Sequence, residues 1–553
     1  MSLFFNIHGG YFIMNKKIIF SYFIIMTALC GLIIRLFFVS QGETLAQAAQ
    51  NQSTKTIEAA NNRGTIYDYK LKSLVNEEEI YTATVIPTPE AMDAIMNNIN
   101  NNEKENAAQK FRDGSPFIQR LKSPLKTKIE GIEVFSSKVR YNYNQLAPHI
   151  IGYLNDTKDS GIYGCEKIFN KELSKANGEI TVTYKVDAMG RLMGGIKPEI
   201  KNTIDNSKNG IVLTLDKDIQ KIAQDVAKKY LKAGAVVIMD IKTGEIRASV
   251  SVPDYSPLDV GKALRENDSP FLNRTFTQYN LGSIFKLVSA AAYLEAGGTI
   301  ERQYKCKGNI TVGNNVFSCH NINGHDVITM REAISKSCNP YFISLMQEVG
   351  PDIFYEYVND LGFGKASIFY NGLKTDSGVI PSRESLDGPA VLANLSFGQG
   401  ELLATPVQVA CLISCIANNG IYNNAKLIKG TTDGEKIEVF NQNNQEGKQV
   451  LSTKTALQLQ TLMSGVMKED ATGEAAKPNN VKAAGKTATA QTGIIKDGKE
   501  VDQSWFAGFF PSDDPKYAVV TLGENTDEGR LVTCPCFKEI AEKITILENK
   551  IQE

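Results

Sequence analysis

Two short apolar runs decide the fold of the C-terminal part of the chain: Ala235-Val-Val-Ile-Met239 and Ile246-Arg-Ala-Ser-Val250, separated by the turn Lys242-Thr-Gly244. Such β-branched runs around a glycine turn predict a β-hairpin. Helical periodicity precedes the hairpin from Asp216 to Leu231, and helical stretches follow it from Ser283 to about residue 480.

The end of the chain returns to strand-like sequence before a last amphipathic helix. Two strands, many helices, three strands and a final helix predict an α+β domain, whose central antiparallel sheet is built from both ends of this region and flanked by helices. The closing elements are expected at Lys482–Thr492, Ser504–Phe510, Tyr517–Leu522 and Phe537–Gln552.

Upstream of this domain, the sequence has a different pattern of apolar and polar residues. Short β-like runs broken by polar stretches extend from Arg63 to about Val212, which predicts a mostly β domain. We expect a cytoplasmic tail at 1–17, a transmembrane anchor at 18–39, this β domain at 40–212 and the α+β domain at 213–553.

The anchor is predicted from one uncharged run. Ile18 to Ile34 contains no charged residue, and about 20 apolar residues are enough to span a bilayer. Lys16 and Lys17 precede the run, which favours a cytoplasmic N-terminus. The alternative is a cleaved signal peptide, but no small-x-small cleavage site follows at once. We therefore expect a single-pass protein of the cell membrane whose C-terminal domain is extracellular.

The overall composition excludes several classes. The 60 Lys and Arg residues balance the 61 Asp and Glu residues, so there is no electrostatic reason to expect nucleic acid as a partner. A hydrophobic content of 42% excludes a disordered or collagen-like chain. With only four histidines in the chain, few candidates exist for a histidine base.

A nucleophile that needs no histidine stands at Gly282-Ser283-Ile-Phe-Lys286. Ser283 and Lys286 lie one helical turn apart, so a neutral lysine amine can take the proton of the serine hydroxyl. The pattern alone is weak, since Ser123-Pro-Leu-Lys126 repeats it without any matching context.

Two further motifs follow in order. Ser337-Cys-Asn339 offers a hydroxyl and an amide, although serine and asparagine are also common helix caps. Gly485-Lys486-Thr487-Ala488-Thr489 lies on a predicted strand, where its lysine is either a carboxylate ligand or a solvated side chain of a hairpin.

Together the three motifs resemble the Ser-x-x-Lys, Ser-x-Asn and Lys-Thr-Gly set of penicillin-binding proteins and serine β-lactamases. The anchor and the β domain make the chain similar to class B penicillin-binding proteins. The resemblance implies that 40–212 is a pedestal or dimerisation domain, and that 213–553 is a transpeptidase domain, which would be the extracellular catalytic domain. Further segments similar to signatures of that family are Arg63–Asp68, His149–Gly152, Gly161–Glu166, Phe397–Gly400, Ala471–Gly473 and Ser504–Pro511.

The resemblance implies a peptidoglycan D,D-transpeptidase that cross-links stem peptides through a serine acyl-enzyme and is inhibited by β-lactams. It implies lipid II-derived glycan as substrate and, because we recognise no glycosyltransferase domain before the pedestal, a polytopic glycan polymerase as partner. Elongation, division and sporulation are all roles open to such a protein.

The resemblance also implies roles for the residues of the three motifs. The implied catalytic residues are Ser283, Lys286, Ser337 and Asn339. The implied substrate-binding residues are Lys486, Thr487 and Thr489. The N–H groups of Ser283 and Thr489 would form the oxyanion hole.

The chain departs from the family pattern at Ala488, where the family has glycine; the added methyl group could reshape access for β-lactam side chains.

The alternative function is a membrane-bound β-lactam sensor, or a scaffold of a cell-wall synthesis complex. A sensor of that kind usually has several spanning segments, and the intact motifs argue against a scaffold without activity. A β-lactamase needs no anchor and pedestal.

A cysteine and histidine set lies between the first and third motifs. Three thiolates and one imidazole make a closed Cys3His set for a structural Zn²⁺, and no organic cofactor is expected. The alternative is a Cys306–Cys319 disulfide with a free, buried Cys338. Cys411, Cys415, Cys534 and Cys536 are expected to be structural. The proposed ligands are Cys306, Cys319, His325 and Cys338. His320 is adjacent to Cys319 and is expected to point elsewhere, in either a strand or a helix.

Overall fold

The computed structural model contains two compact units that interleave along the chain. The boundary expected between residues 212 and 213 does not follow this division, because segments 63–78 and 138–177 pack with the C-terminal part. The N-terminal unit comprises Met1–Asn62, Glu79–Ser137 and Gly178–Ile204, and the C-terminal unit comprises Arg63–Glu78, Lys138–Asn177 and Asp205–Glu553. The structure describes residues 4–7, 10–13, 16–40, 53–204, 208–440, 446–496, 498–524 and 529–552.

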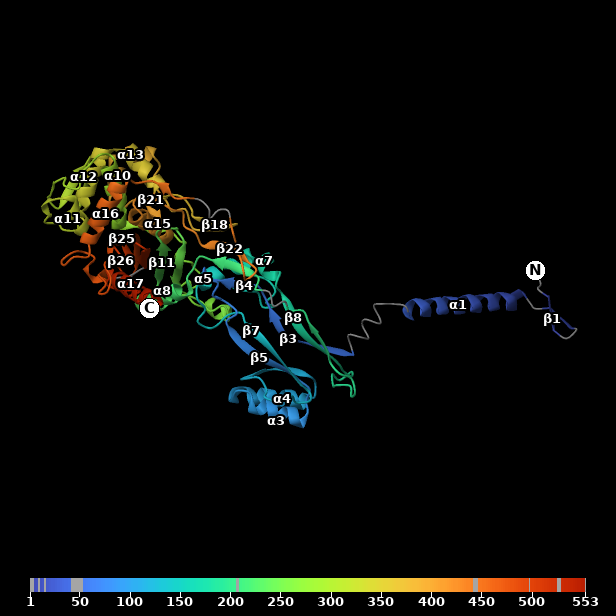
Figure 1. Ribbon diagram of the computed structural model, residues 1–553. Coiled ribbons are helices and arrows are strands. Elements are labelled where there is room, and N and C mark those ends of the chain that lie inside the picture. The colour runs from blue at the N-terminus through green and yellow to red at the C-terminus, as the bar shows by residue number, and fades with distance from the viewer. Residues whose placement is uncertain are drawn as a thin grey trace. The chain divides into compact units, whose positions relative to one another are not determined.

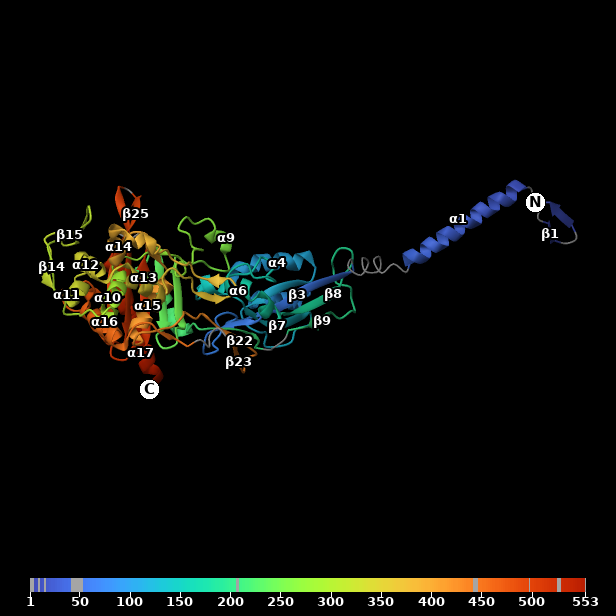
Figure 2. The ribbon, with the colours of Figure 1, turned by 90° about the horizontal axis from the view of Figure 1, so that it is seen from above.

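The C-terminal unit is built on one five-stranded antiparallel sheet (Figure 1). Its strand order, β12-β11-β27-β26-β25, joins two strands from the start of the domain to three from its end, which confirms the predicted α+β fold. In Figure 2 the far end of β25 projects beyond the helices around it. The strands are β11 (Gly234–Asp240), β12 (Ile246–Val252), β25 (Ala484–Lys496), β26 (Lys499–Phe510) and β27 (Tyr517–Gly523).

Helices cover both faces of this sheet. Along β11, Ala235, Val237 and Met239 belong to one core cluster, whereas Val236 and Ile238 belong to another, as the two-residue period of a strand requires. The first cluster includes residues of α10 (Lys286–Glu295), α12 (Asn339–Val349), α15 (Pro406–Ala417) and α16 (Thr453–Gly465). The second includes residues of α8 (Lys217–Tyr230) and α17 (Arg530–Gln552).

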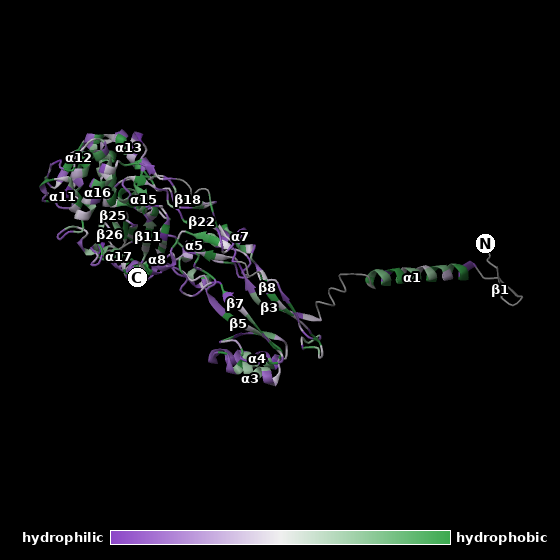
Figure 3. Ribbon diagram, in the orientation of Figure 1, coloured by the Kyte–Doolittle hydropathy of each residue, from purple (hydrophilic) through white to green (hydrophobic). Residues whose placement is uncertain are grey.

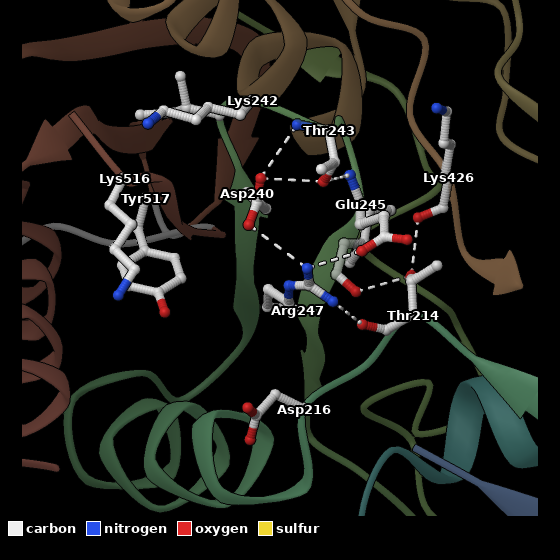
Figure 4. Close-up of polar contacts among 12 residues, drawn as sticks. Thr214, Asp216, Asp240, Lys242, Thr243, Glu245, Arg247, Lys426, Lys516 and Tyr517 are labelled. Carbon is white, nitrogen blue, oxygen red and sulfur yellow. Dashed lines mark hydrogen bonds and ion pairs between the residues drawn. The ribbon is translucent and has the colours of Figure 1, made fainter. Parts of the chain in front are cut away.

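A polar network fixes the turn end of the β11–β12 hairpin (Figure 4). The Arg247 guanidinium donates to the carbonyl oxygen of Thr214 at 3.1 Å and pairs with Asp240 and Glu245 at 3.3 and 2.6 Å. It also lies 4.0 Å from the ring centroid of Tyr69. Because Arg247 is 7% exposed, these contacts satisfy a nearly buried charge and tie the hairpin to the preceding strand β10 (Gly210–Leu213).

The N-terminal unit is mostly β, as expected for the pedestal. Helices α3 (Pro89–Asn97) and α4 (Lys104–Asp113) share a small core with strand β5 (Glu78–Val85). One of its sheets has the order β6-β5-β7 and another the order β3-β8-β9. The remaining strands are β3 (Thr54–Asn62), β6 (Phe117–Leu121), β7 (Ile132–Val139), β8 (Gly178–Lys185) and β9 (Glu199–Asn202).

The predicted anchor lies in one long helix, α1 (Lys16–Ser40). Apolar residues run along its length (Figure 3), and the side chains described in it are exposed apart from the half-buried Ile19. Among the described residues, α1 is the one helix long and apolar enough to cross a membrane.

Candidate active site

The expected nucleophile, Ser283, lies on a tight turn that is held in place by a contact between two glycines. Gly282–Phe285 forms a 3-10 turn leading into α10, and Gly282 has a φ of 64°. Its N–H donates to the carbonyl oxygen of Gly398 at 3.1 Å. A Cβ on Gly398 would lie 1.9 Å from the carbonyl oxygen of Gly282, so only glycine allows this approach. The loop Phe397–Gly400 therefore holds the turn that carries Ser283.

Lys286 is fully buried one turn after Ser283. Its amine donates to the carbonyl and hydroxyl oxygens of Ser337, at 2.7 and 3.0 Å, and to Oδ1 of Asn339 at 2.7 Å. The first and second sequence motifs are thus joined directly by hydrogen bonds.

Ser337 lies in the turn between α11 (Met330–Ser335) and α12, with a φ of 55°. A positive φ is uncommon for serine, and such strain often accompanies functional sites. Its hydroxyl oxygen lies 3.0 Å from Lys286 Nζ and 3.3 Å from Lys486 Nζ, so one hydroxyl bridges two amines. Asn339 is the first residue of α12, and its amide nitrogen donates to the carbonyl oxygen of Ser318 at 3.2 Å.

The third motif lies on β25, the edge strand of the sheet. Lys486 is fully buried, and its amine also donates to the carbonyl oxygen of Thr487 at 2.9 Å. The Thr487 hydroxyl lies 3.0 Å from the hydroxyl of Thr472, which donates to the carbonyl oxygen of Ser335 at 3.1 Å. Thr472 lies outside the three motifs, within the family-like segment Ala471–Gly473, so spacing alone does not assign it a role.

Burial lowers the pKa of both lysines. Desolvation brings the pKa of Lys286 to about 7. The pKa of Lys486 is lowered well below its ordinary value, first by burial and then by the nearby charge of Lys286. Two amines that approach the same hydroxyl cannot both be protonated without electrostatic cost, so the pair favours at least one neutral amine.

Thr489 and Ala488, neighbours on β25, differ in their exposure to solvent. Thr489 is exposed, and its carbonyl oxygen lies 3.1 Å from where a Cβ on Gly282 would stand. This backbone therefore passes close to the nucleophile turn. Ala488 is 4% exposed and belongs to the same core cluster as Trp505, so its methyl group is packed into the domain.

The four predicted metal ligands converge. Their ligand atoms all lie within 4.8 Å of one another. Cys319 Sγ lies 3.6 Å from His325 Nδ1 and 4.0 Å from Cys338 Sγ. Cys306 ends β14 (Tyr304–Cys306), and its carbonyl oxygen accepts from the N–H of His325 at 3.1 Å. Cys338 immediately precedes α12 and separates the two catalytic candidates Ser337 and Asn339.

One expectation about this cluster is wrong. His320 was expected to point away from the neighbouring Cys319, but its Nδ1 lies 3.9 Å from Cys319 Sγ, and its ring centroid lies 5.3 Å from that of His325. The loop before β17 (Asp326–Ile328) is neither strand nor helix here, so adjacent side chains need not diverge. The four cysteines expected to be structural are buried: Cys411, Cys415, Cys534 and Cys536. Cys165 of the same unit is buried as well.

Comparison with known proteins shows to which family of proteins this chain is related. Residues 234–542 match the family of the penicillin binding protein transpeptidase domain. Stage V sporulation protein D of Bacillus subtilis is 28% identical over 517 residues, covering 88% of this chain and 77% of that protein. The peptidoglycan D,D-transpeptidase PbpA of Mycolicibacterium smegmatis is 28% identical over 363 residues, covering 61% of this chain and 71% of that protein.

A solved structure has the same fold. Penicillin binding protein 3 from Mycobacterium tuberculosis, complexed with aztreonam, aligns with a TM-score of 0.62 at 23% identity, covering 90% of this chain and 97% of that one. Because the family match takes up more than half of the chain, this protein belongs to the penicillin-binding protein transpeptidase family.

Proposed function

We propose that this protein is a membrane-anchored peptidoglycan D,D-transpeptidase with Ser283 as its nucleophile. The observation that carries the proposal is the Ser337 hydroxyl, which lies within 3.3 Å of the amines of both Lys286 and Lys486. The proposal is also supported by the name of the mycobacterial relative, a peptidoglycan D,D-transpeptidase.

The first half of the proposed reaction forms an ester. Neutral Lys286 takes the proton of Ser283, whose Oγ attacks the carbonyl carbon of the penultimate D-alanine of a stem peptide. The N–H groups of Ser283 and Thr489 would stabilise the negative charge on the carbonyl oxygen. When the intermediate collapses, the amide C–N bond breaks, and the proton passes through the Ser337 hydroxyl to the leaving amine of D-alanine.

The second half uses the same groups in reverse. An amine from a neighbouring stem attacks the ester carbon and gives up a proton, a new peptide bond forms, and Ser283 regains its hydrogen. One amide bond is broken and one is made, so the reaction needs no oxidant or nucleotide. Lys486, Thr487 and Thr489 would bind the terminal carboxylate of the donor stem, and Asn339 would orient Lys286 and the substrate amide.

A β-lactam would be attacked in the same way. The ring amide opens on acylation, but its amine remains attached to the acyl group and cannot leave, so the acyl-enzyme persists. The proposal that β-lactams inhibit this protein is supported by the fold it shares with a penicillin binding protein solved with aztreonam.

Intact-mass spectrometry after incubation with a penicillin tests the nucleophile. The full chain should gain one penicilloyl group, and Ser283→Ala should gain none. Ser123→Ala is the matched control, because Ser123 heads the second Ser-x-x-Lys pattern on an exposed surface and should leave labelling unchanged. Labelling that persists in Ser283→Ala would contradict the assignment.

A second assay separates an enzyme from a β-lactam sensor or a scaffold. A stem peptide ending in D-alanyl-D-alanine, mixed with an amine acceptor, should release D-alanine and yield the cross-linked product. A protein that is acylated by penicillin but releases no D-alanine would be a sensor or scaffold instead.

The membrane arrangement is a further part of the proposal. Lys16 and Lys17, which begin α1, favour a cytoplasmic N-terminus with residues beyond 40 outside the cell. Protease added to intact wall-stripped cells should therefore cleave that region; complete protection would reverse the topology. A polytopic glycan polymerase, which would supply the glycan strands, should co-purify with the full chain from a mild detergent extract.

We also propose that Cys306, Cys319, His325 and Cys338 hold a structural Zn²⁺. In a tetrahedral site, bond lengths of about 2.3 Å to sulfur and 2.0 Å to nitrogen imply S–S and S–N distances of about 3.8 and 3.5 Å. The observed 4.0 and 3.6 Å distances from Cys319 Sγ are compatible with these values. Four protein ligands leave no open position, so the ion would stabilise the Ser337–Asn339 turn and take no part in the chemistry.

Elemental analysis of protein purified without added metal tests this proposal. About one zinc per chain is expected, and chelation should lower the melting temperature and slow acylation together. His325→Ala should lose the zinc, whereas His320→Ala, which removes the neighbouring imidazole, should retain it. A metal-free protein with a mapped Cys306–Cys319 disulfide would exclude the zinc site.

A further inference from the structure

The loop that connects β8 to β9 in the N-terminal unit carries exposed apolar side chains. Met189, Met193 and Ile196 are 74%, 45% and 46% exposed, and Ile200 on β9 is 46% exposed. Single apolar side chains on a surface are ordinary, but four large ones within twelve residues mark an interaction surface.

Strand register places this loop at one end of its sheet. β3 and β8 pair antiparallel, with Thr54 opposite Lys185, and the N–H of Val186 donates to the carbonyl oxygen of Ser53 at 2.9 Å. β9 returns beside β8, with Glu199 opposite Thr183. The loop therefore leaves the sheet at the end where the chain enters it from α1.

Chain length keeps that end near the membrane. The predicted anchor helix ends at Ser40, and residues 41–52 connect it to Ser53. Whatever their conformation, twelve residues span at most about 40 Å. The β8–β9 loop lies beside Ser53 and so is within reach of the surface from which α1 emerges.

The turn at the start of the loop is ordered by hydrogen bonds. The Asp187 carboxylate accepts from the N–H groups of Met189 and Arg191, both at 2.9 Å. The Ser115 hydroxyl donates to the carbonyl oxygen of Gly190 at 2.8 Å. Met189 is therefore held outward by a defined turn.

The charge of the segment suits a lipid surface. From Lys185 to Lys201 it contains four basic and two acidic residues, a net charge of +2. Basic residues beside a membrane are attracted to anionic headgroups, and apolar side chains among them can enter the headgroup boundary.

From these observations we propose that the β8–β9 loop is a second membrane contact, which inserts Met189, Met193 and Ile196 into the anionic lipid surface that α1 crosses. The contact would orient the N-terminal unit on the bilayer. A protein partner would call for a flat apolar face, whereas these side chains lie on a loop beside Lys197 and beside Arg191, which pairs with Asp187 at 2.9 Å.

Quenching by brominated lipid tests the proposal in the full chain. Met189→Trp adds one indole to a protein whose only tryptophan, Trp505, is buried and serves as the internal reference. The variant is reconstituted in vesicles of brominated phosphatidylglycerol and phosphatidylcholine. Met92→Trp is the matched control, because Met92 is 41% exposed on α3 of the same unit.

The added emission of Met189→Trp should fall about twofold in brominated vesicles, as expected for insertion to the acyl boundary, and less in phosphatidylcholine alone. Met92→Trp should be unaffected, and both variants should retain their melting temperature and penicillin acylation. Absent quenching, or equal quenching of the two variants, would overturn the proposal. Protection of the added indole only when a glycan polymerase is co-reconstituted would also overturn it, in favour of a protein partner.

Discussion

Replacing Gly398 by alanine should disable the nucleophile turn from a position outside the three motifs. Gly398 has a φ of 87°, and a Cβ there would lie 1.9 Å from the carbonyl oxygen of Gly282. Since Cβ atoms essentially never approach backbone oxygen closer than about 3 Å, either the loop or the turn must move by about 1 Å.

The expected losses of stability and of acylation rate in Gly398→Ala are worked out separately. An alanine in the left-handed region costs about 1–2 kcal/mol of stability. A displacement of about 1 Å of a reacting group can cost about 100-fold in rate. Because Ser283 is the next residue after Gly282, we expect Gly398→Ala to lose about 100-fold in the rate of penicillin acylation.

Gly400→Ala is the matched control for backbone strain. Gly400 has a φ of 80° in the same loop, but a Cβ there would meet only the Asn394 side chain, at 3.2 Å. Acylation rates with a fluorescent penicillin and thermal melting should show a similar strain cost in both variants, with the rate loss confined to Gly398→Ala. Wild-type acylation by a folded Gly398→Ala protein would refute the argument.

Three further predictions concern single residues. Because only neutral Lys286 is a base and its pKa is about 7, the acylation rate measured by stopped flow should fall about tenfold for each pH unit below 7 and level off above it. Ala488→Gly removes a buried methyl group, so it should lower stability in denaturant unfolding by about 1–2 kcal/mol and leave acylation within about threefold; a large rise in acylation would mean that the methyl faces the ligand. Buried Glu166 pairs with Arg63 at 3.0 Å and Arg140 at 2.7 Å. Glu166→Gln should therefore lower the free energy of unfolding by about 3–5 kcal/mol, and a neutral result would contradict the importance of this pair.

Much of the fold was predictable because its signals are local. Apolar runs with the period of a strand stand at 235–239 and 246–250, and the structure pairs them as a hairpin. The long apolar run from Ile18 likewise became one helix. The interleaving of the two units was not predictable, because which unit segments 63–78 and 138–177 join depends on packing against residues far along the chain.

For the site, the residue types and their order were determined by the sequence alone. Serine, lysine, asparagine and the cysteine set are recognisable from residue type and spacing, whereas the lowered pKa of Lys286 comes from its burial in the fold. Only the tertiary structure decided that Lys286 and Lys486 share the Ser337 hydroxyl, that His320 lies beside Cys319, and that Gly398 passes against Gly282. The physical reason is range: local preferences act over a few residues, whereas these contacts join segments that meet only when the sheet and its helices have packed.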